Sequence, residues 1–168
     1  LNGRLTALHG DATKLDIAEG SADFVVICET HVTEHGGCVT EEDQIFFAKV
    51  LSTLKPGGFL VWGNAIPDDT WEPCFQHLQS IGMQQLDMHD VTAEAVRARD
   101  PDQDRTEHYV RKCVDKFYGF KIPVLGKRRE FQAQQALKNF YRHPGTNLYE
   151  NMVNGTDSYR VVLFQKPE

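Results

Sequence analysis

Three short apolar runs near the start of the chain most constrain its fold. They occupy residues 5–9, 24–28 and 59–62, and the last two read Phe-Val-Val-Ile-Cys and Phe-Leu-Val-Trp. Runs that are apolar at nearly every position are typical of parallel strands covered on both faces. Between the last two runs, Phe47, Val50, Leu51 and Leu54 recur at helical spacing. The order predicts strands joined by a helix in a parallel α/β sheet.

Both ends of that helix are marked by residues that favour helix termini. Thr40 is a good N-cap, and three acids follow it where the helix dipole favours negative charge. Pro56 disfavours helical geometry at Lys55. We therefore expect a helix from about residue 41 to Lys55, a turn at Gly57-Gly58, and a strand from Phe59 to Gly63.

The rest of the chain predicts a second helix, a helical segment and a last strand. Trp71, Phe75 and Leu78 indicate a helix that Gly82 stops, and a weaker strand follows over 83–88. Residues 92–145 read as three helices with a loop over 122–126, and 159–164 as a β-branched and aromatic strand. The 168 residues are expected to form one α/β domain, with 92–145 as a helical insertion or lid.

An acid stands at the end of each of the first two apolar runs. Asp11 comes after residues 5–9, and Glu29 after residues 24–28. Ligands of an open parallel sheet bind outside the carboxyl ends of its strands, so both acids are ligand candidates. An Asp that caps a turn and a solvated Glu are the alternatives.

Charge is distributed unevenly along the chain. The net charge is -6, which argues against general nucleic-acid binding. Residues 93–142 nevertheless hold 12 of the 18 Lys and Arg and only 7 of the 24 Asp and Glu. Arg128, Arg129 and Tyr141 from this segment are expected to meet an anionic or aromatic small-molecule substrate. The alternative is a solvated charged face with the aromatic residues in the core.

The sequence contains no sign of a membrane span or of an extracellular protein. No apolar run approaches the roughly 18 residues that a spanning helix needs. The four cysteines form no CxxC pair, which indicates reduced thiols and a cytoplasmic protein.

Three phrases, spread over about residues 5–90, resemble class I S-adenosylmethionine-dependent methyltransferases. They are Gly10-Asp11-Ala12, the stretch 21–26 (Ser-Ala-Asp-Phe-Val-Val), and 50–58, which ends in Leu-Lys-Pro-Gly-Gly. The resemblance implies a Rossmann-like sheet with strand order 3-2-1-4-5-7-6 and an antiparallel last strand. Its strands 3 to 7 would be residues 5–9, 24–28, 59–63, 83–88 and 159–164.

The resemblance also implies roles for individual residues. Asp11 would accept a hydrogen bond from the adenine amine of S-adenosylmethionine, with Gly10, Ala12 and Cys28 beside the cofactor. Glu29, His31 and His35 would lie where substrate meets the methyl group, and either His could act as a general base. Residues 31–35 also match HxxEH, a zinc-peptidase motif, but Gly36-Gly37 makes a poor helix context; we expect no metal.

Part of the family pattern is missing from the sequence. No GxGxG-like loop occurs, and two βα units, about 60 residues at about 30 each, have no counterpart. Without them residues 24–28 would form an exposed sheet edge. We therefore expect the chain to be the C-terminal portion of a larger domain, or another chain to complete the sheet.

The sequence leaves three functions open. The first is methyl transfer from S-adenosylmethionine to a small molecule by in-line displacement. The second is a non-catalytic methyltransferase-like domain that binds a partner where the missing strands would lie. The third, a dehydrogenase-like nucleotide-binding enzyme, is disfavoured because no GxGxxG motif occurs.

Overall fold

A computed structural model describes residues 7–29, 39–118 and 125–168 of the chain. The chain divides into two compact units. The first unit comprises the residues up to His89 together with Arg160–Glu168, and the second comprises Asp90–Tyr159.

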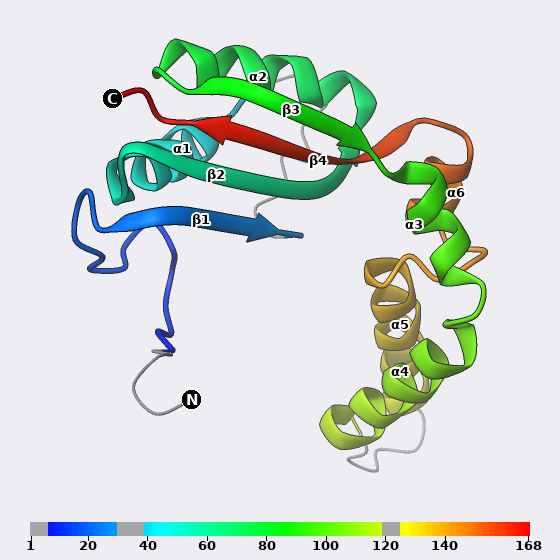
Figure 1. The fold of residues 1–168 in the computed structure, drawn as a ribbon. Coiled ribbons are helices and arrows are strands. Elements are labelled where there is room, and N and C mark those ends of the chain that lie inside the picture. Colours follow the sequence, from blue (N-terminus) through cyan, green and yellow to red (C-terminus); the bar gives the residue numbers. More distant parts are fainter. Residues whose placement is uncertain (1–6, 30–38, 119–124) are drawn as a thin grey trace. The chain divides into compact units, whose positions relative to one another are not determined.

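The first unit is built on a four-stranded mixed sheet. Its strands are β1 (Ala22–Cys28), β2 (Leu54–Pro67), β3 (Gln84–Asp90) and β4 (Asp157–Gln165), in the order β1-β2-β4-β3. β1 and β2 are parallel, whereas β4 runs in the opposite direction to the other three (Figure 1). This arrangement confirms the α/β fold and the expected order 4-5-7-6 with an antiparallel last strand.

Helix α1 (Glu41–Thr53) begins as its sequence predicts. The Thr40 side chain accepts a hydrogen bond from Asp43 N, and the Asp43 carboxylate accepts one from Thr40 N at 2.7 Å. This reciprocal capping box satisfies two backbone donors that the first turn leaves without a helical partner. Asp43 is itself buried, so the cap also fixes the depth at which α1 enters the core.

The predicted turn at Gly57-Gly58 belongs instead to β2. Ala22 of β1 pairs with Leu54 of β2, and Phe24 pairs with Phe59. An advance of two residues on β1 therefore corresponds to an advance of five on β2. The extra residues make a bulge, in which Gly57 has a φ of +73° that glycine adopts without strain. The turn prediction was wrong because the bulge stays paired on its other side, where Gly57 N donates to the Lys166 carbonyl at 2.9 Å.

The core of this unit lies on one face of the sheet. Helix α2 (Trp71–Ser80) follows a short 3-10 helix (Asp68–Thr70) and packs on the same face as α1 (Figure 1). Aromatic rings join the layers: Phe47 of α1 meets Trp62 of β2 at 5.3 Å between ring centroids, and Trp62 meets Trp71 at 4.9 Å. Their burial, at about 25 cal/mol per Å² of apolar surface, holds both helices to the sheet.

The other face of the sheet is apolar and exposed at the β1 edge. Successive strand residues point to opposite faces, so Phe24 and Val26 point away from the buried Ile27. Their exposed fractions are 63% and 67%, and Phe24 stacks on Phe59 at 5.2 Å. Among the residues of the first unit that the structure describes, no helix covers this face. β1 is also an edge strand of the sheet, as expected.

The strand expected at residues 5–9 is not formed in its described part. Ala7–His9 have no regular structure, and residues 5 and 6 lie outside the described residues. A strand needs a neighbour to pair with, and the sequence contains no counterpart of the two strands that would lie between it and β1.

The second unit is helical. It contains α3 (Thr92–Arg99), α4 (Gln103–Tyr118), α5 (Leu125–Phe140) and α6 (Asn147–Val153). The first three were predicted, whereas α6 was not. Of the expected loop at 122–126, Leu125 and Gly126 belong to α5, and the rest lies outside the described residues. α4 and α5 pack together, and a 2.9 Å ion pair joins Glu107 to Lys138.

Within the described ranges, no helix combines the length and the apolarity that a transmembrane segment requires.

The exposed face predicts an unusual response to polar substitution. We expect the double variant Phe24→Ser, Val26→Ser to unfold at a urea concentration close to wild type, because both side chains already contact water, and to bind less of a hydrophobic dye. The matched control is Val25→Ser, Ile27→Ser, which should cost several kcal/mol because these side chains pack on the core side. Equal destabilisation by the two double variants would mean that another part of the chain covers the face in solution.

Candidate functional site

A tight turn at Asp11 forms the first part of the candidate site. One carboxylate oxygen of Asp11 accepts hydrogen bonds from the backbone N–H and the hydroxyl of Thr13, at 3.0 and 2.7 Å. The other lies 2.8 Å from Lys14 Nζ. The Lys14 ammonium, with help from Thr13, lowers the pKa of Asp11 from 3.8 to about 2. Asp11 therefore stays ionised, and a pure hydrogen-bond acceptor, at every physiological pH.

The turn leaves part of the Asp11 carboxylate available. A carboxylate has about four acceptor sites on its two oxygens, and Thr13 and Lys14 use three. The side chain is 48% exposed, so a further donor can reach it. Asp11 thus caps a turn, as the alternative interpretation held, and can still accept from an exocyclic amine.

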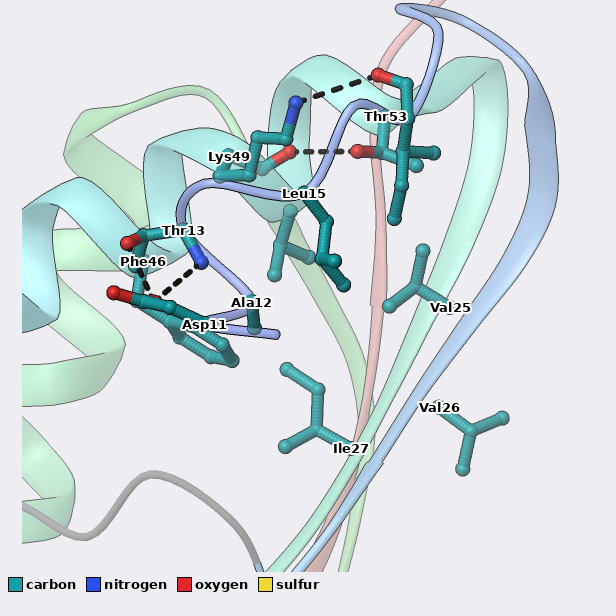
Figure 2. Close-up of a pocket in the computed structure, with 12 residues that line it drawn as sticks. Asp11, Ala12, Thr13, Leu15, Val25, Val26, Ile27, Phe46, Lys49 and Thr53 are labelled. Atoms are coloured by element: carbon teal, nitrogen blue, oxygen red, sulfur yellow. Dashed lines mark hydrogen bonds between the residues drawn. The ribbon is translucent and has the colours of Figure 1, made fainter. Parts of the chain in front are cut away.

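Asp11 and Ala12 line a cavity of about 410 Å³ in the first unit (Figure 2). The turn, β1 and α1 each provide one wall. Most of the lining is apolar, and the described lining residues are Asp11, Ala12, Thr13, Leu15, Ile17, Val25, Val26, Ile27, Phe46, Lys49, Val50 and Thr53. Small-molecule sites typically enclose about 300–1,000 Å³ with mostly apolar walls and a few placed polar groups. A flat heterocycle with one amine suits this combination.

Sequence reasoning missed the α1 contribution to this cavity. Phe46, Lys49, Val50 and Thr53 recur every three or four residues along one helix face. Only Val50 was assigned to the inward face. The same periodicity could have predicted that Phe46 and Thr53 face β1. It could not have predicted how closely they approach the turn.

Glu29 ends β1 in a strained conformation. Its φ is +50°, a left-handed value that costs a non-glycine residue about 1–3 kcal/mol. Its N–H donates to the Gly63 carbonyl at 2.9 Å, which continues the pairing of β1 with β2 by one residue. The bond supports the left-handed backbone and holds Glu29 at the carboxyl end of β1, where strain points to function.

The other predicted site residues fall in several places. Gly10 and Cys28 are exposed and are not among the lining of the Asp11 cavity. By strand alternation, Cys28 points to the same face as Phe24 and Val26. His31 and His35 lie outside the described residues.

The predicted substrate residues belong to the second unit. Tyr141 follows α5 and lines a separate pocket of about 300 Å³. Arg129 is exposed on α5, and the side chain of Arg128 lies outside the described residues.

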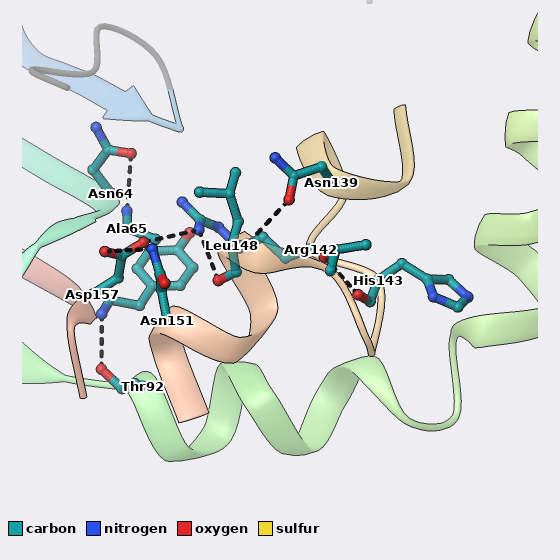
Figure 3. A network of polar contacts seen from close by, with 11 residues as sticks. Asn64, Ala65, Thr92, Asn139, Arg142, His143, Leu148, Asn151 and Asp157 are labelled. Atoms are coloured by element: carbon teal, nitrogen blue, oxygen red, sulfur yellow. Dashed lines mark hydrogen bonds and ion pairs between the residues drawn. The ribbon is translucent and has the colours of Figure 1, made fainter. Parts of the chain in front are cut away.

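A buried polar network holds the end of the second unit together (Figure 3). Arg142 lies 3.6 Å from Asp157, and both side chains are more than 90% buried. Arg142 also donates to the Leu148 carbonyl at 3.4 Å, and the Asn139 side chain accepts from Leu148 N at 3.1 Å. The network ties the α5–α6 connection to the start of β4. Since both ions are buried and paired, we assign it a structural role.

The sequence is similar to curated methyltransferases. It is 27% identical over 166 residues to phthiotriol/phenolphthiotriol dimycocerosates methyltransferase of Mycobacterium leprae, and 26% identical over 163 residues to the corresponding methyltransferase 1 of Mycobacterium ulcerans. These matches cover 96% of this chain but 52% and 51% of the relatives. The chain thus spans about half the length of the relatives it matches. No family model matches the sequence.

Solved structures share the fold. A phosphoethanolamine N-methyltransferase 2 of Haemonchus contortus, in complex with phosphomonomethylethanolamine and S-adenosylhomocysteine, gives a TM-score of 0.61 at 11% identity over 94% of this chain and 36% of its own. The StiE O-methyltransferase (residues 961–1257) gives 0.56 at 21% identity over 95% and 48%. A putative sarcosine dimethylglycine methyltransferase of Galdieria sulphuraria gives 0.54 at 13% over 94% and 58%.

The strain at Glu29 predicts that a glycine variant is more stable than an alanine variant at this position, the reverse of their order within a helix. We expect Glu29→Gly to be about 1 kcal/mol more stable than Glu29→Ala in urea unfolding, because glycine adopts the left-handed conformation freely. Ala48, exposed on α1, is the control: there Ala48→Gly should cost about 1 kcal/mol. An alanine variant at position 29 as stable as the glycine variant would contradict the strain.

The sequence matches and the strand order lead to one assignment. The chain is similar in sequence to curated methyltransferases over 96% of its length, and it has the fold of the class I S-adenosylmethionine-dependent methyltransferases.

Proposed function

We propose that the chain takes part in methyl transfer from S-adenosylmethionine to a small-molecule acceptor. The observation that carries the proposal is the ionised Asp11 carboxylate at an apolar cavity beside β1. Its remaining acceptor site suits the exocyclic amine of adenine, and the walls suit the two faces of the ring. The methyltransferase homology supports the same ligand.

The residues of the chain mainly position the reactants. The bound cofactor supplies an electrophilic sulfonium methyl group, so the protein needs chiefly to align an in-line displacement. Asp11 and Ala12 would orient the adenosyl end. Glu29, held at the carboxyl end of β1 by its bond to Gly63, would orient the acceptor, and His31 or His35 would remove its proton.

The names of relatives and structural neighbours support a small acceptor. The mycobacterial relatives are named for phthiotriol and phenolphthiotriol dimycocerosates, and the Haemonchus contortus enzyme was solved with phosphomonomethylethanolamine. Substrate contacts from Arg128, Arg129 and Tyr141 remain part of the proposal, as does a cytoplasmic location.

We further propose that additional polypeptide completes the sheet at β1. Three observations support this: β1 is an edge strand, Phe24 and Val26 expose an apolar face beside it, and the chain spans about half of its relatives. Parallel sheets are normally covered on both faces. The completing segment would pair with β1, cover that face and supply the glycine-rich loop for the methionine part of the cofactor.

The exposed face also favours a second candidate function. A methyltransferase-like domain without a cofactor could use Phe24 and Val26 to bind a protein partner. The two functions differ in whether the Asp11 cavity binds an adenosyl group.

Calorimetric titration with S-adenosylhomocysteine and with 5′-methylthioadenosine tests the proposal. We expect Asp11→Asn to weaken both ligands about tenfold, because it keeps an oxygen for Thr13 and places an amide donor where the adenine amine would donate. Asp23→Asn is the matched control, since Asp23 is also exposed and also ion-paired to a lysine at 2.8 Å. The two ligands should bind within about threefold of each other, because the sequence contains no GxGxG-like loop for the amino-acid end.

Each part of this experiment can fail separately. No binding of either ligand would favour the non-catalytic function. If Asp11→Asn and Asp23→Asn changed the ligand affinities equally, adenine would not bind in the Asp11 cavity. Much tighter binding of S-adenosylhomocysteine than of methylthioadenosine would contradict the need for a completing segment.

A further inference from the structure

The second unit contains a polar pocket, and of its described lining residues only Tyr141 has a role in the proposed methyl transfer. It encloses about 300 Å³, and all of its described lining residues belong to that unit: Arg99, Asp102, Arg105, Thr106, Tyr109 and Tyr141. Two arginines and two tyrosines thus line one pocket.

Local hydrogen bonds hold the pocket in shape. Arg99 ends α3, and its carbonyl accepts from Asp102 N at 3.2 Å in the link to α4. The Asp102 carbonyl then accepts from Thr106 N at 2.9 Å. Arg105 and Tyr109 lie one helical turn apart on α4 and therefore share a face. Tyr141 N donates to the Leu137 carbonyl at 2.9 Å, which continues α5 into the pocket wall.

The charge of the lining is positive. Arg99 and Arg105 contribute two positive charges and Asp102 one negative charge, which leaves one net positive charge. The Asp102 carboxylate lies 2.6 Å from Arg105 and orients its guanidinium. A guanidinium carries five N–H donors, so others can serve a second acceptor. Arg99 is half-buried, so a charge beside it is less screened than on the open surface. A planar guanidinium binds carboxylate or phosphate in a bidentate manner.

The tyrosines define the rest of the ligand. Tyr109 is 56% exposed and Tyr141 38% exposed, although both rings are large and largely apolar. Rigid aromatic rings beside arginines offer flat surfaces on which another ring can stack. The volume lies at the lower end of small-molecule sites and suits a single ring with one anionic substituent.

We propose that this pocket binds an aryl anion, a flat ring that bears a carboxylate or phosphate group, with Arg99 and Arg105 on the anion and Tyr109 and Tyr141 on the ring. The inference rests on the proposed function in one respect: the aryl anion would be part of the methyl acceptor. Binding itself requires no cofactor.

The test uses the whole chain without cofactor, at low salt. Phenyl phosphate, benzoate and phenol are titrated separately, and their binding is measured from the changes in backbone amide NMR chemical shifts. We expect at least one of the two anions to bind, and phenol to bind at least tenfold more weakly than that anion. Arg99→Met and Arg105→Met should each weaken the anion at least fivefold. Tyr109→Ala should weaken benzoate and phenol together. Comparing phenyl phosphate with benzoate distinguishes a phosphate from a carboxylate ligand.

Arg97→Met is the matched control. Arg97 lies two residues before Arg99 on the same helix, pairs with Glu94 at 3.0 Å and does not line the pocket. Its variant should bind as wild type does. The inference is overturned if neither anion binds, if phenol binds as tightly as the anions, or if Arg97→Met loses as much affinity as the other two arginine variants.

Two arginine variants keep the test decisive if one of them does not fold, because Arg105 is exposed and its substitution disturbs no buried group. The outcome is also separable from that of the proposed function. If the chain bound the anion but no adenosyl ligand, the methyl-transfer proposal would be overturned and the proposal for this pocket would stand. If it bound the adenosyl ligand but no anion, only the proposal for this pocket would be overturned.

Discussion

The parallel pairing of β1 with β2 is the constraint on which the candidate site depends. The register sets Ile27 opposite Trp62 and Cys28 opposite Gly63. Ile27 thereby joins the core beneath α1, and the N–H of Glu29, two residues further along, donates to the Gly63 carbonyl. A slip of one residue would exchange the two faces of β1 and place Phe24 and Val26 in the core. The same pairing therefore creates the cavity wall, the strained strand end and the exposed face.

Much of the first unit could be predicted because its signals are local. The Thr40 cap, the acids after it and the spacing of Phe47 and Val50 specify α1 without reference to the rest of the fold. The order of the strands is not local, and it came from the family resemblance. The resemblance also identified the free edge of β1, since it showed which strands have no counterpart in the sequence.

The remaining features depend on distant partners. Pro56, Gly57 and Gly58 carry ordinary turn chemistry, yet they stay within β2 because Lys166, near the other end of the chain, pairs with Gly57 and Gly58. α6 has only seven residues, and its Met152 is buried by tertiary packing rather than marked by a periodic pattern. In the site, Asp11 was found by its position after a strand-like run. The contribution of Phe46 and Lys49 required knowledge of how α1 meets the turn.

The central claim is that an adenosyl group lies in the cavity between the Asp11 turn, β1 and α1. Intermolecular nuclear Overhauser effects between the protein and bound S-adenosylhomocysteine test it most directly. The account predicts contacts from the adenine H2 and H8 protons to the Ala12 and Ile27 methyl groups and to the Phe46 ring, all of which line the cavity. Contacts from adenine to residues of the second unit alone, with none to these three, would contradict it.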